Sequence, residues 1–480
     1  MRLDELIVAY PSAVKVRGED DAIIESVEID SRLVGPGSLF CCISGTNDDG
    51  HRFIAQALDA GAVGILTERD HGFELGEAFE IRVPDGSARN ASAIFSAAIA
   101  GNPAERLRMV GITGTNGKTT VAHLLGEILR GAGFDARVIG TLTGARTTPP
   151  APELHRMLQE AVAHAEREQK PGAVAMEVSS HALDQGRVSG IDFDVCVFTN
   201  LSHDHLDYHG TMEQYFETKA QLFDPAHCST AVIWVDSSYG RQLASRSLAK
   251  VVEVSSDSVT QINSSLTGST FLWRGKETSL GLVGRVNVIN AALALEAAVA
   301  LGVDSDVARE GLRGVGPIQG RMELVSDPGA APSVIVDYAH TPDALEGLLS
   351  EARRLVSTAG KVILVFGCGG ERDQQKRPLM GDVASNGADV VIVTTDNPRG
   401  EDPADISSAI IAGASSSARV REEPDRRRAI KQAIEMAGPD DVVLVAGKGH
   451  ESTQIIGLVE APFDDRVVAR EILAERNTAC

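Results

Sequence analysis

The feature that most constrains this chain is a glycine-rich loop at residues 111–120, which read GITGTNGKTT. An apolar run at 108–113 leads into the loop, and helical periodicity follows over 119–130 until Gly131 and Gly133 end the pattern. Glycines let backbone N–H groups turn toward phosphate oxygens, and a helix N-terminus adds partial positive charge. A strand, such a loop and a helix in succession predict a nucleotide-phosphate site in an α/β domain.

The end of this loop carries two side chains with distinct tasks in such a site. Lys118 reaches the β- and γ-phosphates, and the hydroxyl of Thr119 is a Mg²⁺ ligand. The strict spacing GxxxxGK is not met, because Ile112 lies where the first glycine is expected. We therefore predict an atypical phosphate loop for a nucleotide. Its binding residues are Gly114, Thr115, Asn116, Gly117, Lys118, Thr119 and Thr120.

The length and punctuation of the chain predict three domains. At roughly 100–200 residues per domain, a chain of 480 residues is long enough for about three. The sequence Gly-Asn-Pro at 101–103 breaks an alanine-rich helical segment. We place the domains at 1–102, 103–323 and 324–480. Strands that alternate with helices predict an α/β fold, with a mostly parallel sheet in the central domain.

Short β-rich runs mark the expected strands. They lie at 38–44, 62–67, 173–176, 195–199, 231–235, 333–337, 361–366, 390–394 and 442–445. Gly, Asp, Asn or His follows most of these runs in the C-terminal third. Ligands of open α/β sheets bind at the carboxyl ends of the strands, so these polar residues mark the expected site. The polar segment 255–269 is expected to be a surface excursion.

Composition excludes several classes of function. Lys and Arg number 45 against 67 Asp and Glu, a net charge of −22, which argues against a nucleic-acid-binding protein. The six cysteines form no CxxC pair, so reduced thiols are favoured over zinc or disulfide frameworks. No signal peptide is recognisable, and no run approaches the ~18 apolar residues of a membrane span. We expect a cytoplasmic protein.

Further motifs follow the phosphate loop in a fixed order. They are EVSSHAL from Glu177, TNLSHDHLDYHG from Thr199, NVINAALA from Asn287, GRME from Gly320, DYAHTPDALE from Asp337, FGCGGERDQQKRPLMG from Phe366, TDNPRGEDP from Thr395 and AGKGHE from Ala446. This series spans nearly the whole chain and resembles the Mur ligase family. The resemblance implies a UDP-binding N-terminal domain, a central ATPase domain and a Rossmann-like C-terminal domain. It also implies an amide-bond ligase that uses ATP and Mg²⁺.

The same resemblance implies catalytic and metal-binding residues. Glu177 and His205 would bind Mg²⁺ together with Thr119, and Lys118 would contact the phosphates. Lys219 would be carboxylated by CO₂, which turns a cation into a carboxylate that can also ligate the metal. Spacing alone would make Glu177 a helix cap or surface acid and Lys219 part of a solvated helix face. Further ATP contacts are implied for Asn290, Arg321, Asp337 and His340, whose alternative is a capping or turn role.

The implied acceptor is UDP-N-acetylmuramoyl-L-alanyl-D-glutamate. Its contacts would be Ser31, Thr46, Asn47, Asp48, Thr147, Thr148, Ser179, Gln185 and Arg187. Taken alone, several of these are ordinary turn residues. Two features depart from the family pattern. The loop 141–146 is shorter than expected, and Arg146 stands where Asn or His is common.

The implied incoming amino acid is meso-2,6-diaminopimelate. Within the family, Asp-Asn-Pro-Arg goes with this substrate, and lysine-adding members usually replace the arginine. A guanidinium can grip the second carboxylate of diaminopimelate with two hydrogen bonds. The alternative is a plain Asn-Pro turn. The implied contacts are Arg372, Asp396, Asn397, Pro398, Arg399, Gly447 and Glu451.

The resemblance therefore implies ligation through an acyl phosphate by a monomeric enzyme of peptidoglycan precursor synthesis. Alternatives are the same ligation with L-lysine, and a folylpolyglutamate-synthetase-like ligase, which shares the phosphate loop but lacks a UDP-type N-terminal domain. An NAD-dependent oxidoreductase is suggested by GCGG at 367–370. That fingerprint is incomplete, because Glu371 and Arg372 follow it. A non-catalytic binding module would retain nucleotide binding without turnover.

Overall fold

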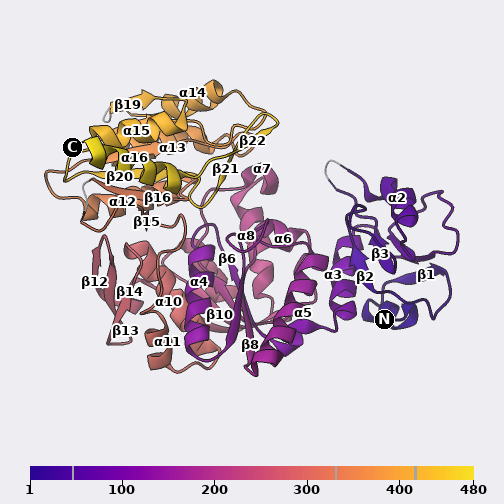
Figure 1. Ribbon diagram of the computed structural model, residues 1–480. Coiled ribbons are helices and arrows are strands. Elements are labelled where there is room, and N and C mark those ends of the chain that lie inside the picture. Colours follow the sequence, from indigo (N-terminus) through magenta and orange to yellow (C-terminus); the bar gives the residue numbers. More distant parts are fainter. Residues whose placement is uncertain (46–47, 330–331, 416–418, 480) are drawn as a thin grey trace.

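The computed structural model describes residues 1–45, 48–329, 332–415 and 419–479. Thr46 and Asn47, both predicted to contact the acceptor, lie outside these residues. Three α/β units follow one another along the chain, each built around its own sheet (Figure 1). No helix in these described ranges is long and apolar enough to cross a membrane.

The N-terminal unit is a five-stranded sheet in the order β1-β5-β4-β3-β2, parallel except for β1. Helix α3 packs between this sheet and helix α5 of the central unit (Figure 1). The elements are α1 (Leu3–Ala9), β1 (Val14–Arg17), β2 (Ser26–Glu28), β3 (Ser38–Cys41), η1 (Gly50–Phe53), α2 (Ile54–Asp59), β4 (Gly64–Thr67), β5 (Phe79–Arg82), α3 (Ala88–Ile99) and η2 (Pro103–Arg106).

The central unit is a six-stranded parallel sheet in the order β11-β10-β9-β6-β8-β7. Strand β6 lies between β8 and β9, so the phosphate loop leaves the sheet where the strand order changes direction. The elements are β6 (Arg108–Thr113), α4 (Lys118–Gly131), β7 (Asp135–Ile139), α5 (Ala151–Glu168), β8 (Gly172–Glu177), α6 (Ser180–Asp184), β9 (Phe193–Phe198), α7 (Leu206–His209), α8 (Met212–Ala220), η3 (Gln221–Phe223), β10 (Cys228–Trp234), α9 (Ser238–Arg246) and β11 (Lys250–Val254).

A small antiparallel sheet, β12-β13-β14, covers helix α10 of the central unit. The polar segment expected at the surface includes the mostly exposed strand β12, whereas Phe271 and Trp273 of β13 are buried in the core. The elements are η4 (Ser256–Ser258), β12 (Val259–Ser265), β13 (Gly268–Trp273), β14 (Lys276–Leu280), α10 (Arg285–Ala300) and α11 (Ser305–Gly311).

The C-terminal unit is a six-stranded sheet in the order β15-β16-β20-β17-β18-β19, parallel except for β15. A separate hairpin, β21–β22, precedes the last helix. The elements are β15 (Glu323–Leu324), β16 (Ser333–Asp337), α12 (Pro342–Leu355), β17 (Val362–Phe366), α13 (Lys376–Gly387), β18 (Val390–Val393), α14 (Pro403–Gly413), β19 (Arg419–Glu422), α15 (Arg426–Met436), β20 (Val442–Ala446), β21 (Thr453–Ile456), β22 (Val459–Pro462) and α16 (Asp465–Ala479).

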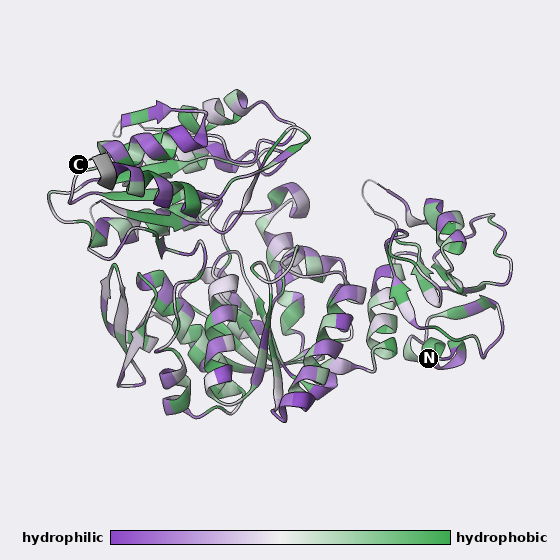
Figure 2. Cartoon of the chain, viewed as in Figure 1, coloured by the Kyte–Doolittle hydropathy of each residue, from purple (hydrophilic) through white to green (hydrophobic). Residues whose placement is uncertain are grey.

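Aliphatic side chains fill the cores, as expected for a chain with only 4% aromatic residues. Strands β17 and β20 are buried along their whole length, the pattern of a parallel sheet covered on both faces. Figure 2 shows hydrophobic strands inside each unit and hydrophilic residues on the outward faces of many helices. This arrangement leaves polar residues free to gather in the loops at the carboxyl ends of the strands.

Candidate active site

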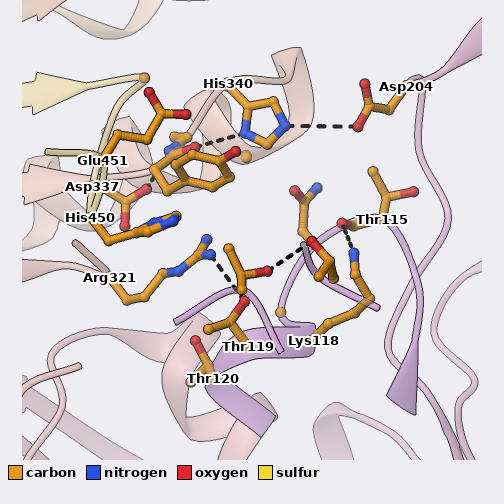
Figure 3. A pocket seen from close by; sticks show the side chains of 18 of the residues that line it. Thr115, Lys118, Thr119, Thr120, Asp204, Arg321, Asp337, His340, His450 and Glu451 are labelled. Atoms are coloured by element: carbon orange, nitrogen blue, oxygen red, sulfur yellow. Dashed lines mark hydrogen bonds and ion pairs between the residues drawn. The ribbon is translucent and has the colours of Figure 1, made fainter. Parts of the chain in front are cut away.

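The central and C-terminal units share a large cavity of about 1150 Å³. Its walls come from the phosphate loop, from the loops after β8 and β9, and from the loops after β16, β17, β18 and β20 of the C-terminal sheet. Every one of these loops follows the carboxyl end of a strand, where parallel sheets place their ligands. Figure 3 shows part of this cavity, with Arg321 pointing toward the phosphate loop.

Hydrogen bonds hold the phosphate loop in its folded form. The ammonium of Lys118 donates to the carbonyl oxygens of Gly114 and Thr115, each at 2.9 Å (Figure 3). Gly114 has φ +144°, and a Cβ there would lie 1.9 Å from the hydroxyl of Thr199, so only glycine fits. Burial lowers the pKa of Lys118, and the nearby carboxylates of Glu177 and Asp204 partly oppose this shift. These hydrogen bonds fix the ammonium group of Lys118 against the phosphate loop.

Thr119, Glu177 and Arg321 converge at the start of helix α4. The Thr119 hydroxyl donates to Glu177 Oε2 at 3.0 Å and accepts from Arg321 Nη2 at 3.0 Å. Glu177 ends strand β8, is 1% exposed, and also accepts from the backbone N–H of Thr141 at 2.8 Å. This burial at a strand end contradicts the surface-acid alternative for Glu177. Hydroxyl and carboxylate oxygens side by side are the donor set that suits Mg²⁺.

His205 and Asp204 lie in the loop after β9 and line the same cavity. His205 adopts φ +55° and places Nε2 3.3 Å from Asp204 Oδ2. Burial lowers the pKa of His205, which leaves a neutral imidazole. Burial alone would raise the pKa of Asp204, but His205, His340 and Lys376 outweigh it and lower that pKa. Asp204 also faces the C-terminal unit, with His340 at 3.8 Å and Lys376 at 4.0 Å, so it joins the two units.

Lys219 is buried behind the phosphate loop. Its side chain is 1% exposed, and Nζ donates to the Gly114 carbonyl at 3.0 Å. Nζ also lies 4.6 Å from the centroid of the Tyr215 ring. Burial and the neighbouring ammonium of Lys118 lower the pKa of Lys219. The solvated-helix alternative for Lys219 is therefore wrong, although Lys219 is not among the described residues that line the cavity.

The four further residues predicted to contact ATP all line the cavity. Asn290 is buried on α10 and packs against Gly117 of the phosphate loop. The contact is so close that a Cβ on Gly117 would lie 2.6 Å from Asn290 Oδ1. Asp337 accepts backbone N–H groups from Met322 and Ala339, both at 2.7 Å, and burial raises its pKa. Asp337 therefore serves the turn role named as its alternative. Arg321 stacks on Tyr338, with its guanidinium 4.6 Å from the ring centroid.

The predicted acceptor residues divide between two cavities. Ser31, Asp48 and Gln185 line a second cavity of about 720 Å³ between the N-terminal and central units, whereas Thr147, Thr148 and Ser179 line the large one. Thr148 Oγ1 donates to the Glu177 carbonyl oxygen at 2.8 Å. The remaining residue, Arg187, lines both cavities and donates to the Thr148 carbonyl oxygen at 2.7 Å. The two cavities therefore meet close to the end of strand β8.

The predicted amino-acid residues gather in the C-terminal unit. Asn397 Nδ2 donates to Glu451 Oε2 at 2.8 Å, which joins the loops after β18 and β20. Arg399 adopts φ +52° and donates to the Gly370 carbonyl oxygen at 2.7 Å. The residues of this set that line the cavity are Arg372, Asp396, Asn397, Arg399, Gly447 and Glu451; Pro398 belongs to the same loop.

Sequence reasoning missed several charged residues of the site, among them Lys448 and Asp373. Lys448 is fully buried and donates to Asn397 Oδ1 at 3.2 Å and to Glu451 Oε2 at 2.9 Å, so it fixes both side chains. Asp373 Oδ2 accepts from His203 Nε2 at 2.8 Å, a contact between the central and C-terminal units. Lys448 lies in the motif AGKGHE and Asp373 in the motif FGCGGERDQQKRPLMG. The spacing of residues within a motif does not show which distant segments they will contact.

Three family descriptions match successive parts of the chain. The Mur ligase family catalytic domain matches residues 23–100, the Mur ligase middle domain matches 112–298, and the Mur ligase glutamate ligase domain matches 320–449. The matches follow the order of the three sheets. The expectation of three α/β units, with mostly parallel sheets in the second and third, is confirmed.

Known proteins match over the whole chain. A relative from Synechococcus elongatus is 41% identical over 100% of both chains, and one from Gloeobacter violaceus is 42% identical over 100% of this chain and 99% of the relative. Each is named UDP-N-acetylmuramoyl-L-alanyl-D-glutamate–2,6-diaminopimelate ligase. A solved structure with that name is 33% identical, has a TM-score of 0.66, and is matched over 99% of this chain and 100% of its own.

A more distant structure shows the shared fold. Folylpolyglutamate synthase from Mycobacterium tuberculosis, solved with ADP, has a TM-score of 0.56 at 21% identity and covers 75% of this chain and 92% of its own. It therefore leaves a quarter of this chain unmatched, whereas the relatives named above extend over all three units. On the identity and coverage of those relatives, the chain belongs to the Mur ligase family.

Proposed function

We propose that this chain joins meso-2,6-diaminopimelate to UDP-N-acetylmuramoyl-L-alanyl-D-glutamate with hydrolysis of ATP, in peptidoglycan precursor synthesis. The observation that carries the proposal is the shared cavity. One space of about 1150 Å³ is lined by the phosphate loop, by Thr148 and Ser179, and by the loop with Arg399. ATP, the acceptor and the amino acid can therefore bind next to one another in the same cavity. The names of the relatives supply the identity of the two substrates.

The reaction proceeds in two steps on the side-chain carboxyl group of D-glutamate. First, a carboxylate oxygen attacks the γ-phosphorus of ATP, and ADP leaves from an acyl phosphate. Lys118 and Arg321 face the developing charge, because both guanidinium and ammonium groups lie at the phosphate loop. Second, an amine of diaminopimelate attacks the acyl carbon, and phosphate leaves. The walls of the cavity hold donor and acceptor together and limit access of water to the acyl phosphate.

Mg²⁺ would complete the proposed site, and Thr119, Glu177 and His205 are the residues that would hold it. A bound cation of this kind neutralises phosphate charge during transfer. The fit is best at Thr119 and Glu177, which present oxygen atoms 3.0 Å apart. Among the described residues, no group of three or more His, Cys, Asp and Glu side chains forms a metal cluster. Ligands beyond these must then come from phosphate oxygens, water or a modified lysine.

Carboxylation of Lys219 is part of the proposal. The amine nitrogen would bond to the carbon of CO₂ and lose a proton, which gives a carbamate. Burial of the amine beside Lys118 favours a neutral, nucleophilic form. We would supply ¹³C-bicarbonate and record ¹³C NMR spectra of the protein. A carbamate signal that Lys219→Ala lacks supports the modification, and identical spectra of the two proteins contradict it.

Arg399 and Glu451 are the proposed determinants of the amino acid. Arg399 would hold the distal carboxylate of diaminopimelate, and Glu451 would face its distal ammonium. L-Lysine has no distal carboxylate, so the guanidinium of Arg399 would be left without a partner. Lys448 neutralises part of the charge on Glu451 and fixes its position.

The proposed division of labour follows three domains at 1–102, 103–323 and 324–480. The first would bind the UDP end of the acceptor, the second ATP, and the third the amino acid. The working unit of the proposed enzyme is a monomer. We place the reaction in the cytoplasm, where its nucleotide-linked acceptor and ATP would be available.

The experiment follows ¹⁸O from the acceptor. The D-glutamate carboxylate is labelled with ¹⁸O, and the purified protein is supplied with ATP, Mg²⁺ and meso-diaminopimelate. An acyl phosphate requires one ¹⁸O atom in the released phosphate and one remaining in the amide product, both measurable by mass spectrometry. Product without ¹⁸O in the phosphate contradicts the acyl phosphate. No product with any amino acid contradicts the ligase.

A further inference from the structure

Three arginines meet where the two cavities join. Arg146 and Arg187 line both cavities, and Arg89 lines the second cavity. They come from separate segments: Arg89 from helix α3 of the N-terminal unit, Arg146 from the short loop before α5, and Arg187 from the segment after α6. Helices α3 and α5 pack together at this junction (Figure 1). Residues from two units therefore converge on one point.

The positive charges at this point are not neutralised by the protein. None of the three arginines forms an ion pair with any carboxylate in the described parts of the chain. The other two arginines of the second cavity differ, since Arg32 pairs with Asp30 at 2.6 Å and Arg156 with Glu28 at 2.9 Å. Guanidinium groups placed together without acids are unusual in a protein of net charge −22. A bound anion is the simplest source of the missing charge.

Other contacts hold Arg187 and Arg89 in position without neutralising them. Arg187 donates to Gln185 Oε1 at 2.6 and 3.1 Å, and Arg89 donates to the Ser44 carbonyl oxygen at 3.3 Å. Burial, followed by the charges of Arg146 and Arg89, lowers the pKa of Arg187 to about 10. The three groups are thus close enough to repel one another, a cost that an anion between them would offset.

We infer that Arg89 and Arg146, together with Arg187, form the site for the diphosphate of the nucleotide-linked acceptor. This inference rests on the proposed function and adds two specificity-determining residues to it. A diphosphate diester carries two negative charges, and planar guanidinium groups bind phosphate oxygens with paired hydrogen bonds. The position between the cavities places the uridine side in the second cavity and the peptide side in the large one.

Arg146 is the last residue of the short loop 141–146. The side chain of Arg146 is exposed and lines both cavities. The loop 141–146 lies along the wall of the large cavity and ends at the junction. A short loop holds its last side chain against the junction more firmly than a long flexible one, because fewer residues must be ordered. Arg146 therefore presents a full positive charge at the junction.

The test measures binding of UDP by calorimetry together with the kinetics of ligation. The variants are Arg146→Asn, which keeps a polar side chain but removes the charge, and Arg89→Ala. The matched control is Arg167→Ala, an exposed arginine in the last turn of α5 that lines neither cavity. A thermal melt of each variant shows whether it is folded. Each variant removes one positive charge, so the control reports the effect of net charge alone.

We expect the Kd for UDP and the KM for the acceptor to rise about 10-fold in each test variant. That is the low end of what one charge-assisted hydrogen bond contributes, because Arg146 is exposed to salt and water. The KM for ATP and for the amino acid should change less than about 2-fold, as should every constant of Arg167→Ala. The affinity of the unmodified protein for UDP should also fall more steeply with salt than that of either test variant.

Two results would overturn the inference. One is an unchanged Kd for UDP in both test variants, and the other is an equal loss in Arg167→Ala. Failure of the unmodified protein to bind UDP would also refute it. Binding of UDP is measured without turnover, so a protein that binds UDP through these arginines but forms no amide would refute the proposed ligase and retain the cationic site.

Discussion

Two neighbouring arginines on helix α15 allow a sharp test of how burial sets the value of an ion pair. Arg426 contacts Asp465 with two hydrogen bonds of 2.7 Å, and both side chains are 0% exposed. Arg427 pairs with Glu471 at 2.6 Å, with side chains 47% and 49% exposed. The two pairs join the same helices, α15 and α16, and differ in their access to water and in the further hydrogen bonds of Arg426.

Arg426 also supports the amino-acid loops. Its guanidinium donates to the carbonyl oxygens of Thr395 at 3.4 Å and Ala446 at 2.9 Å, the residues just before Asp396 and Gly447. Removing the side chain by Arg426→Ala leaves Asp465 buried without its partner. Breaking a buried pair in this way costs about 3–5 kcal/mol, whereas exposed pairs contribute about 0–1 kcal/mol. We therefore expect Arg427→Ala to be nearly neutral.

The assay is thermal unfolding of the C-terminal unit, followed by hydrogen exchange of the peptides that contain β18 and β20. Following one unit is necessary because a chain of several domains need not unfold in two states. At about 2–4 °C per kcal/mol, Arg426→Ala should lower the Tm of this unit by roughly 6–20 °C, and Arg427→Ala by less than about 4 °C. Replacing both partners, by Arg426→Met with Asp465→Leu, should recover most of the loss. Equal losses in Arg426→Ala and Arg427→Ala, or no recovery in the double variant, would refute the reasoning.

Three further predictions concern positioning and pH. Tyr338→Leu, which removes the ring beneath the Arg321 guanidinium, should lower kcat about 3–30-fold in a phosphate-release assay, while Tyr338→Phe should keep most activity; equal losses would contradict the stacking role. Lys448→Met should raise the KM for the amino acid at least about 10-fold and leave the KM for ATP unchanged, because Glu451 loses its buried partner; parallel changes in both constants would argue for misfolding. Burial lowers the pKa of His155 to about 4 from its usual 6.5. Below pH 6.5 the unfolded chain therefore binds a proton that the folded protein does not. The free energy of unfolding should fall by about 3 kcal/mol between pH 6.5 and 4. The difference in unfolding free energy between the unmodified protein and His155→Leu should therefore change across this range and stay constant above it; a difference independent of pH would refute the assignment.

Much of the fold follows from local sequence. The expected strands at 333–337 and 390–394 correspond to β16 and β18, because short apolar runs ended by polar residues are typical of buried parallel strands. The expected helix after the phosphate loop is α4. The sheet β12-β13-β14 was harder to foresee, because the sequence of β12 is polar and its one buried side chain at the start of the strand gives no alternating pattern.

The candidate site was predicted less completely than the fold. The motifs predict that Glu177, Thr119 and Arg321 belong to one site. In the structure, the hydroxyl of Thr119 contacts both other side chains. Asp204 and Lys448 were not assigned, since their importance depends on partners that arrive through folding. The burial of Lys219 could not be predicted from helical spacing, because the spacing does not show which face of the helix packs against the loop.

The central claim is tested most directly by phosphate release from ATP and Mg²⁺ with UDP-N-acetylmuramoyl-L-alanyl-D-glutamate, with meso-diaminopimelate, L-lysine or no amino acid. The account predicts rapid release with meso-diaminopimelate alone, and loss of that preference in Arg399→Ala. Release with L-lysine alone would keep the ligase and contradict the role of Arg399. Release with neither amino acid would contradict the proposed function.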